Sequence, residues 1–332
     1  MDFELSDDQQ ALQQAARDML DSLAGPEQVR AAANDDQGYD PTLWKAMVEQ
    51  GWLGVELTEQ EGGLGLGTVE AAVLAEQVGR HVAPAPFVET QLALGALQRG
   101  GATEWVERIV NGDAVAAVAW RGDAPVPYAP IADIVVVLDA NKEEVTAVDL
   151  SAGDNKPARE PAMDLTRPLG WLRVGDRATT TIGGKQEAIA LLDRGATAHA
   201  ASLLGSAQRA LEMSTDYAKE RVQFGKPIGS FQAVKHRCAD MLVDVEGMRS
   251  TAYWAAWCLS AGDAESSVAA STAKTWCSDA AKRVMASALQ VHGGIGFTWE
   301  HDLHLFLKRA EANAHAFGDA RWHREQVAEI LL

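Results

Sequence analysis

Two stretches in the last third of the chain decide how the rest is interpreted: residues 221–232, RVQFGKPIGSFQ, and residues 290–297, QVHGGIGF. Each stretch interrupts a long run in which apolar residues recur at helical spacing, so each is expected at a junction between helices. Free backbone N–H groups at such a junction, together with an arginine, suit a bound phosphate. Taken singly, each stretch is equally well explained as a plain helix–turn–helix corner.

The charge of the chain excludes some classes of partner. Its 332 residues include 29 Lys and Arg and 47 Asp and Glu, for a formal net charge of −18. This charge repels DNA and anionic lipid, so we expect neither a nucleic-acid nor a membrane partner. Residues 219–237 nevertheless carry five basic side chains and one acidic one. This basic segment could offset a bound polyanion, or it could be a solvated helix end.

Cysteine usage and the first residues indicate a cytoplasmic protein. No stretch approaches the roughly 20 uncharged apolar residues of a membrane helix, and the start of the chain lacks the basic and apolar regions of a signal peptide. Cys238, Cys258 and Cys277 contain no Cys-x-x-Cys pair, which argues against a disulfide framework or a zinc ribbon. His301 and His304 have no Cys companion, so we expect exposed or core-edge histidines and no metal site.

The pattern of the chain predicts three domains: an N-terminal helical domain at residues 1–113, a reduced middle β domain at 114–185 and a C-terminal helical bundle at 186–332. In the first domain, Ser6 and Gln9 have the form of a capping box that opens a helix, and Gly25-Pro26 ends it. Further helices are expected after Asp40 and over residues 68–78. Between them, GGLGLG at 62–67 matches no nucleotide-binding spacing and is expected to be a flexible turn.

The later elements follow from the same rules. Short β-branched or alternating runs predict strands at 131–138, 145–150, 169–174 and 179–182, with a turn at 139–143. Beyond Gln186 we expect four long helices in an antiparallel bundle, the last running from the glycines at 293–296 to the end of the chain.

Together, about sixty residues apart in an α–β–α chain, the two opening stretches closely resemble the acyl-CoA dehydrogenase flavoprotein family. Residues 51–65 resemble that family's first domain, and residues 165–167 resemble part of its middle domain, so the resemblance spans essentially the whole chain. It implies an α+β multidomain fold with an N-terminal helical domain, a small middle β-barrel and a C-terminal four-helix bundle.

The resemblance also implies a cofactor and a reaction. The cofactor is FAD, the substrate is an acyl-CoA thioester, and the reaction is α,β-dehydrogenation, in which a Glu takes the α-proton. In this family the two motifs reach across a dimer interface to the FAD of the neighbouring subunit. The cofactor-binding residues that it implies here are Arg221, Phe224, Gln232, Gln290, Gly293 and Gly294.

The catalytic base that the family carries is missing. Its two known positions, 27 residues after Gln290 and 29 residues before Phe224, are occupied by Phe317 and Gly195, neither of which accepts a proton. Asp319 is expected on a helix, turned about 200° away from position 317. The Thr-Glu-Pro-x-x-Gly-Ser-Asp type of segment that presents the flavin ring is also missing after the first domain.

These departures resemble the base-less subunit of heterotetrameric bacterial acyl-CoA dehydrogenases, such as those of steroid catabolism. We therefore expect no catalytic residue in this chain and an α2β2 assembly with a homologous catalytic chain that binds most of the acyl-CoA. Two alternatives stay open: a flavin-free scaffold or regulatory pseudoenzyme, and a homo-oligomeric dehydrogenase with an unrecognised base.

Overall fold

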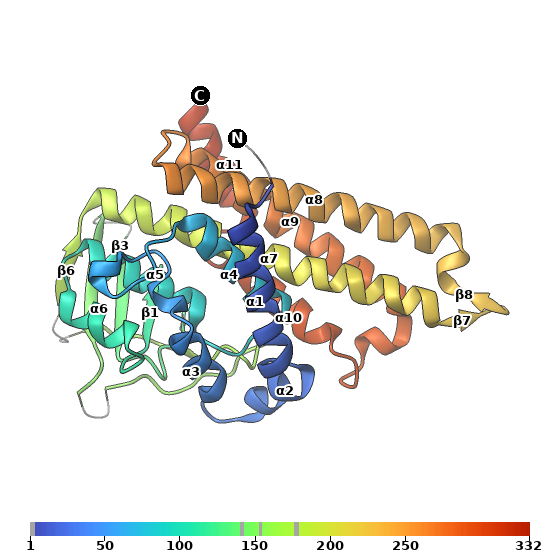
Figure 1. The fold of residues 1–332 in the computed structure, drawn as a ribbon, viewed down its shortest axis with the longest axis horizontal. Helices are drawn as coiled ribbons and strands as arrows, with labels where there is room; N and C mark the ends of the chain where they lie inside the picture. The colour runs from blue at the N-terminus through green and yellow to red at the C-terminus, as the bar shows by residue number, and fades with distance from the viewer. Residues whose placement is uncertain (1–3, 140–142, 153–154, 176–178) are drawn as a thin grey trace. The chain divides into compact units, whose positions relative to one another are not determined.

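The computed structural model describes residues 4–139, 143–152, 155–175 and 179–332 (Figure 1). The chain divides into two compact units. The helical unit consists of Met1–Leu20, Ala72–Val82 and Ala196–Leu332, and the sheet unit consists of Asp21–Ala71 and Ala83–Gly195. The three-domain division at residues 113 and 185 stays a prediction. None of the described helices is both long enough and apolar enough to cross a membrane.

The N-terminal region is helical, as expected. Its elements are α1 (Asp7–Leu23), α2 (Pro26–Asn34), α3 (Pro41–Glu49), the 3-10 turns η1 (Trp52–Gly54) and η2 (Glu59–Glu61), α4 (Thr68–Arg80), α5 (Phe87–Arg99) and α6 (Thr103–Val110).

Helix starts in this region coincide with capping residues. The capping box is confirmed, because Ser6 Oγ accepts the N–H of Gln9 at 3.2 Å and Gln9 Oε1 accepts the N–H of Ser6 at 3.0 Å. Asp40 caps α3 with its carboxylate, which accepts the N–H groups of Thr42 and Leu43. Helix α1 ends before Gly25-Pro26, as expected. Pro26 also begins α2, a helix that the sequence pattern does not predict. Proline suits a first helical position because no N–H is needed there.

Residues 62–67 form the expected turn between η2 and α4, and backbone contacts hold it. The N–H of Leu64 donates to the carbonyl of Gly54 at 2.9 Å. A Cβ on Gly63 would lie 2.5 Å from that same carbonyl oxygen, closer than real Cβ atoms come. The glycines therefore allow one backbone segment to pack directly on another.

The middle region contains a mixed sheet of β1 (Ala116–Ala119), β3 (Ile134–Asp139), β4 (Glu144–Asp149) and β6 (Thr179–Gly183), in the order β1-β3-β4-β6. Strands β1 and β3 are parallel, and the other two pairs are antiparallel. A separate ribbon pairs β2 (Val126–Pro127) with β5 (Leu169–Gly170). The described residues form no closed barrel, so the implied small barrel is corrected to an open sheet.

The expected strands fare unevenly. Those at 131–138 and 145–150 are confirmed as β3 and β4, and that at 179–182 as β6. The strand expected at 169–174 shortens to β5, and β1 is not foreseen because its Ala-rich sequence has low strand propensity. Of the expected turn, residues 140–142 lie outside the described residues.

A buried ion pair fastens this reduced region to helix α5. Arg167 Nη2 donates to Glu89 Oε1, and both side chains are almost fully buried. Nearby, the hydroxyl of Tyr128 donates to the carbonyls of Ala85 and Thr166 at 3.1 and 3.2 Å. Removing one partner of such a buried pair costs about 3–5 kcal/mol, so Arg167 and Glu89 hold the segment in place together.

The C-terminal region forms the expected bundle. Its elements are α7 (Lys185–Glu220), the hairpin of β7 (Val222–Gln223) and β8 (Lys226–Pro227), η3 (Ile228–Ser230), α8 (Gln232–Ala261), α9 (Ser266–His292), η4 (Gly293–Phe297), α10 (Leu303–His315) and α11 (Ala320–Leu331). In Figure 1 the hairpin lies at the end of the bundle where α7 gives way to α8.

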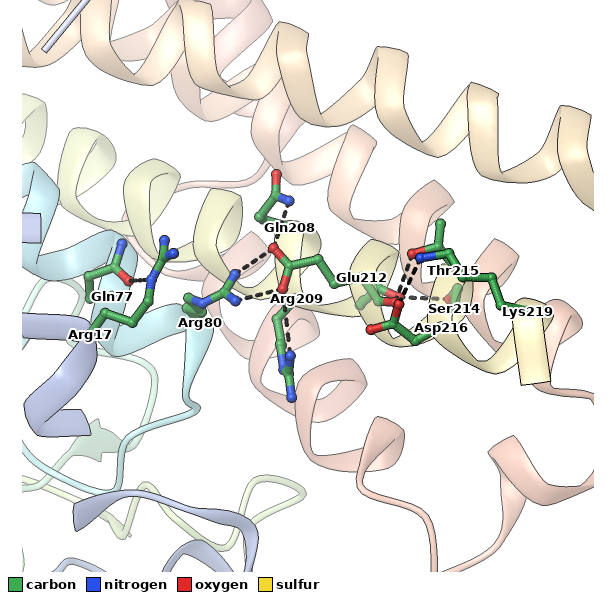
Figure 2. A network of polar contacts seen from close by, with 11 residues as sticks. Arg17, Gln77, Arg80, Gln208, Arg209, Glu212, Ser214, Thr215, Asp216 and Lys219 are labelled. Carbon is green, nitrogen blue, oxygen red and sulfur yellow. Dashed lines mark hydrogen bonds and ion pairs between the residues drawn. The ribbon is translucent and has the colours of Figure 1, made fainter. Parts of the chain in front are cut away.

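Helices α4 and α7 approach at backbone distance in the helical unit. A Cβ on Gly205 would lie 1.8 Å from the carbonyl oxygen of Glu76, and one on Gly79 would lie 2.0 Å from that of Ser202. Figure 2 shows the polar network beside this crossing, in which Arg80 donates to both carboxylate oxygens of Glu212 at 2.8 and 2.6 Å. Close packing and a bidentate ion pair therefore act on the same helix pair.

The prediction of a single last helix is wrong, because the structure has two. Helix α10 ends at His315 and α11 begins at Ala320. Between them Phe317 and Gly318 take φ values of +54° and +99°, which no helix contains, and Asp319 caps α11. The sequence signal for this break, one Gly followed by Asp, is weak.

A buried lysine on α9 holds the break. Lys274 Nζ donates to the carbonyls of Ala314 and Gly318, both at 2.9 Å, and to Ser278 Oγ at 3.1 Å. Its side chain is fully buried, and burial lowers the pKa of Lys274 from 10.5 to about 7. The amine therefore satisfies two carbonyls that the interrupted helix leaves without helical partners.

We expect Lys274→Met to lower the free energy of unfolding by about 2–4 kcal/mol, because two buried carbonyls lose their donor. Between pH 7 and 10 the unfolded chain keeps a proton on Lys274 that the folded chain has released, so this group adds stability as the pH rises. Urea unfolding should therefore show the gap between wild type and variant widening from pH 7 to 10. Lys282→Met, an exposed site on the same helix, is the control and should change little. A gap that narrows with pH would contradict this role.

Candidate functional site

The first of the two opening stretches forms a tight hairpin directly after α7. The N–H of Arg221 donates to the carbonyl of Tyr217 at 2.8 Å, and the N–H of Ile228 donates to the carbonyl of Arg221 at 2.8 Å. These bonds fix the backbone on both sides of Arg221. Its side chain is exposed and forms no ion pair with any described residue, so its guanidinium is available to an anion from outside.

Phe224 stands out at the tip of this hairpin. Its side chain is 91% exposed, and its backbone takes a φ of +53°. A non-glycine residue in this region costs on the order of 1–3 kcal/mol, and burial of its ring does not offset that cost. Among the described residues, the ring of Phe224 contacts that of Phe231 edge to face, at 6.1 Å between centroids. The hairpin thus has a strained backbone at Phe224 and an aromatic ring that faces outward, as expected for a contact made with another molecule.

The second stretch forms the turn between α9 and η4. Gln290 lies exposed in the last turn of α9, and Gly293 ends the helix with a φ of +62°. Gly294 has no left-handed φ, and a Cβ there would meet no described atom within 4 Å. Nothing in the described chain requires glycine at 294, so the missing side chain leaves room for a group from outside. Gln232, at the start of α8, is also exposed.

The structure brings the two stretches to one end of the bundle. The ring of Tyr217, four residues before Arg221, stacks on the ring of His292, which directly precedes Gly293, at 4.8 Å between centroids. His292 lies within the second stretch, but the sequence predicts no role for it or for Tyr217. A contact between rings 75 positions apart leaves no local sequence signal.

Neither expected base position holds an acid. Phe317 is 2% exposed and packs against the ring of His199 at 5.4 Å between centroids, and Gly195 is buried within α7. Asp319 does not lie within a helix, so the expected 200° rotation is the wrong reason for excluding it. Its carboxylate accepts the N–H of Trp322 at 2.8 Å, and this bond lowers its pKa. Asp319 is thus committed to capping α11.

Comparison with known proteins agrees with this geometry. Residues 6–113 match the acyl-CoA dehydrogenase N-terminal domain and residues 183–332 match the acyl-CoA dehydrogenase C-terminal domain. The acyl-CoA dehydrogenase IpdE2 of Mycolicibacterium smegmatis is 37% identical over 98% of this chain and 100% of its own length. The chain therefore belongs to the acyl-CoA dehydrogenase family.

Solved structures of similar proteins cover the whole chain. The crystal structure of the ChsE4-ChsE5 complex from Mycobacterium tuberculosis matches with a TM-score of 0.91 and 29% identity, over 100% of this chain and 99% of that one. A steroid ACAD variant, Tcur3481-Tcur3483, matches with a TM-score of 0.90 and 28% identity, over 98% and 97%.

FAD is the cofactor of this family, and the residues present fit part of it. An uncommitted guanidinium, a glycine with open space before it and an outward-facing ring suit a pyrophosphate and an aromatic base. The position of the family's base, in contrast, is filled by the buried ring of Phe317. The exposed groups therefore suit one end of the cofactor, and neither expected base position offers a carboxylate.

We expect Phe317→Glu not to create a dehydrogenase. A base contributes about 10²–10⁴-fold to the rate, and only when the reacting carbon and the acceptor are already held in place. The new carboxyl would replace a buried ring, so its pKa would be raised and the fold would lose about 3–5 kcal/mol. Thermal unfolding and turnover per bound flavin measure both effects. Phe317→Leu, which stays apolar, should lose less stability. A Glu variant that oxidises acyl-CoA without any other chain would contradict this account.

Proposed function

We propose that this chain is the non-catalytic subunit of an FAD-dependent acyl-CoA dehydrogenase and that it completes the cofactor site of a homologous catalytic chain. The proposal rests on one contrast within the bundle, between the exposed segments around Arg221 and Gly294 and the buried position of Phe317. The segments around Arg221 and Gly294 present groups that suit a pyrophosphate. The base position is closed by Phe317. A pure scaffold has no physical need for the first feature, and a self-sufficient enzyme cannot tolerate the second.

Similar proteins support a heteromeric assembly and a steroid-derived substrate. One similar structure is a complex of two named chains, and the other is named a steroid ACAD. We infer an α2β2 assembly in which the catalytic chain binds most of a CoA thioester derived from a steroid. Exposed apolar side chains on the helical unit, including Leu242, Val243 and Phe297, suit contact with such a chain.

Each proposed residue has a simple physical task. FAD, when bound, supplies the hydride acceptor for the reaction. Arg221 pairs with the pyrophosphate, which is the arrangement that a planar guanidinium favours. Gly293 and Gly294 let their backbone approach the anion closely, and the ring of Phe224 packs on the adenine. Gln232 and Gln290 donate amide hydrogen bonds beside them.

Co-expression with candidate partners tests the proposed assembly. We expect the chain alone to purify without flavin, and to appear in a yellow complex only with a homologous chain that has a Glu at one of the two base positions. Absorbance at the flavin band and protein quantification should give one FAD per pair of chains. Stoichiometric FAD in the chain purified alone would contradict the proposal and favour a homo-oligomeric dehydrogenase. A complex without flavin would favour the scaffold.

Arg221→Ala tests the cofactor contact within that complex. Loss of a charge-assisted contact to phosphate costs about 1.5–3 kcal/mol, so FAD affinity should fall roughly ten- to hundredfold. Equilibrium dialysis measures this change. The matched control is Arg237→Ala, which removes the same charge from an exposed position of α8 outside both motifs, and should keep FAD within about twofold. Equal retention by both variants would show that Arg221 does not bind the cofactor.

A further inference from the structure

Three aromatic rings lie in contact beside the two motif segments. Tyr217 on α7 stacks on His292 of α9 at 4.8 Å and an interplanar angle of 25°. His301, just before α10, meets His292 edge to face at 4.5 Å and 61°. These contacts therefore join the end of α7 to the α9–α10 connection, about 75 positions further along the chain.

Each end of the Tyr217–His292 contact is tied directly to one motif segment. The carbonyl of Tyr217 accepts the N–H of Arg221 at 2.8 Å. His292 is followed at once by Gly293, whose N–H donates back to Leu289. Both rings therefore project from backbone that is hydrogen-bonded to, or directly continuous with, the two motif segments.

The His292 ring is fixed in its own environment. It is 3% exposed, and its Nδ1 lies 2.8 Å from the carbonyl oxygen of Ala288. Because burial lowers its pKa below 6.5, the ring is neutral at pH 7, and Nδ1–H is then the donor to Ala288. The turn of η4 packs against it, since a Cβ on Gly296 would lie 3.0 Å from His292 Cβ.

We propose that Tyr217 and His292 are positioning residues. Their stacked rings hold the Arg221 segment and the Gln290–Gly294 segment at a separation that lets both bind one FAD. This inference rests on the proposed cofactor contact. An aromatic contact contributes about 0.5–1.5 kcal/mol, which corresponds to a change of roughly two- to tenfold in affinity when its loss lets the segments move apart.

The test uses paired variants of the flavin-bound complex. His292→Leu and Tyr217→Leu remove a ring, whereas His292→Phe and Tyr217→Phe keep one at the same place. We expect each Leu variant to weaken FAD binding about three- to tenfold in equilibrium dialysis, and each Phe variant to stay within twofold of wild type. The Tyr217→Leu/His292→Leu double variant should bind FAD about as weakly as a single Leu variant, since both lose one contact.

Two readouts separate positioning from general damage. Thermal unfolding of the flavin-free chain should differ little between the Leu and Phe variants at the same site, while their FAD affinities differ. Additive losses in the double variant, or Phe variants as weak as Leu variants, would overturn the inference. If Arg221→Ala releases FAD while the Leu variants keep it, only the ring stack is wrong. If Arg221→Ala also keeps FAD, or no flavin-bound complex forms, the proposed function itself fails and this inference with it.

Discussion

The helical unit depends on the crossing of α4 and α7, where two glycines let the backbones touch. Any side chain at Gly205 or Gly79 would collide with a main-chain carbonyl of the other helix. Polar contacts reinforce this arrangement: Arg80 of α4 binds Glu212 of α7. Glu76 of α4 also accepts from two side chains of α8, Tyr253 at 2.5 Å and Arg249 at 3.3 Å. Helix α7 is thereby held as a rigid support, and the hairpin with Arg221 follows directly at its end.

The hairpin after α7 and the break between α10 and α11 differ in how exposed their functional positions are. At the hairpin end, an exposed arginine, an outward ring and an open glycine turn remain accessible. At the break between α10 and α11, a buried lysine satisfies the free carbonyls and a phenylalanine takes the place of the base. Accessible groups that suit a cofactor, together with a buried ring at the expected base position, are consistent with the proposed subunit that completes a site in another chain.

Local rules predict much of this fold and long-range contacts account for most of the errors. The capping box of Ser6 and the Asp40 cap need only neighbouring residues, and both are confirmed. The break at Phe317 depends on Lys274, some forty positions away, whose role appears only when α9 and α10 pack together. The turn at Gly63 is rigid because of a carbonyl on a preceding turn, which composition alone does not reveal.

In the candidate site, too, some features follow from local sequence and others only from tertiary packing. Arg221, Phe224 and Gln290 are predicted from motif spacing, and the structure places all three at the surface, where their cofactor role stays a prediction. The ring contact between Tyr217 and His292 is not predicted, because tertiary packing creates it. The Arg167–Glu89 pair, which fastens the middle region to α5, also joins residues 78 positions apart and leaves no local sequence signal.

A structure of the flavin-bound assembly, by crystallography or electron cryomicroscopy, tests the central claim most directly. We expect the guanidinium of Arg221 within hydrogen-bond distance of the pyrophosphate of an FAD whose flavin ring lies in the other chain, with Phe317 buried and no flavin ring beside it. An FAD ring held by residues 114–185 of this chain, or an Arg221 that faces solvent with no phosphate near it, would contradict the account.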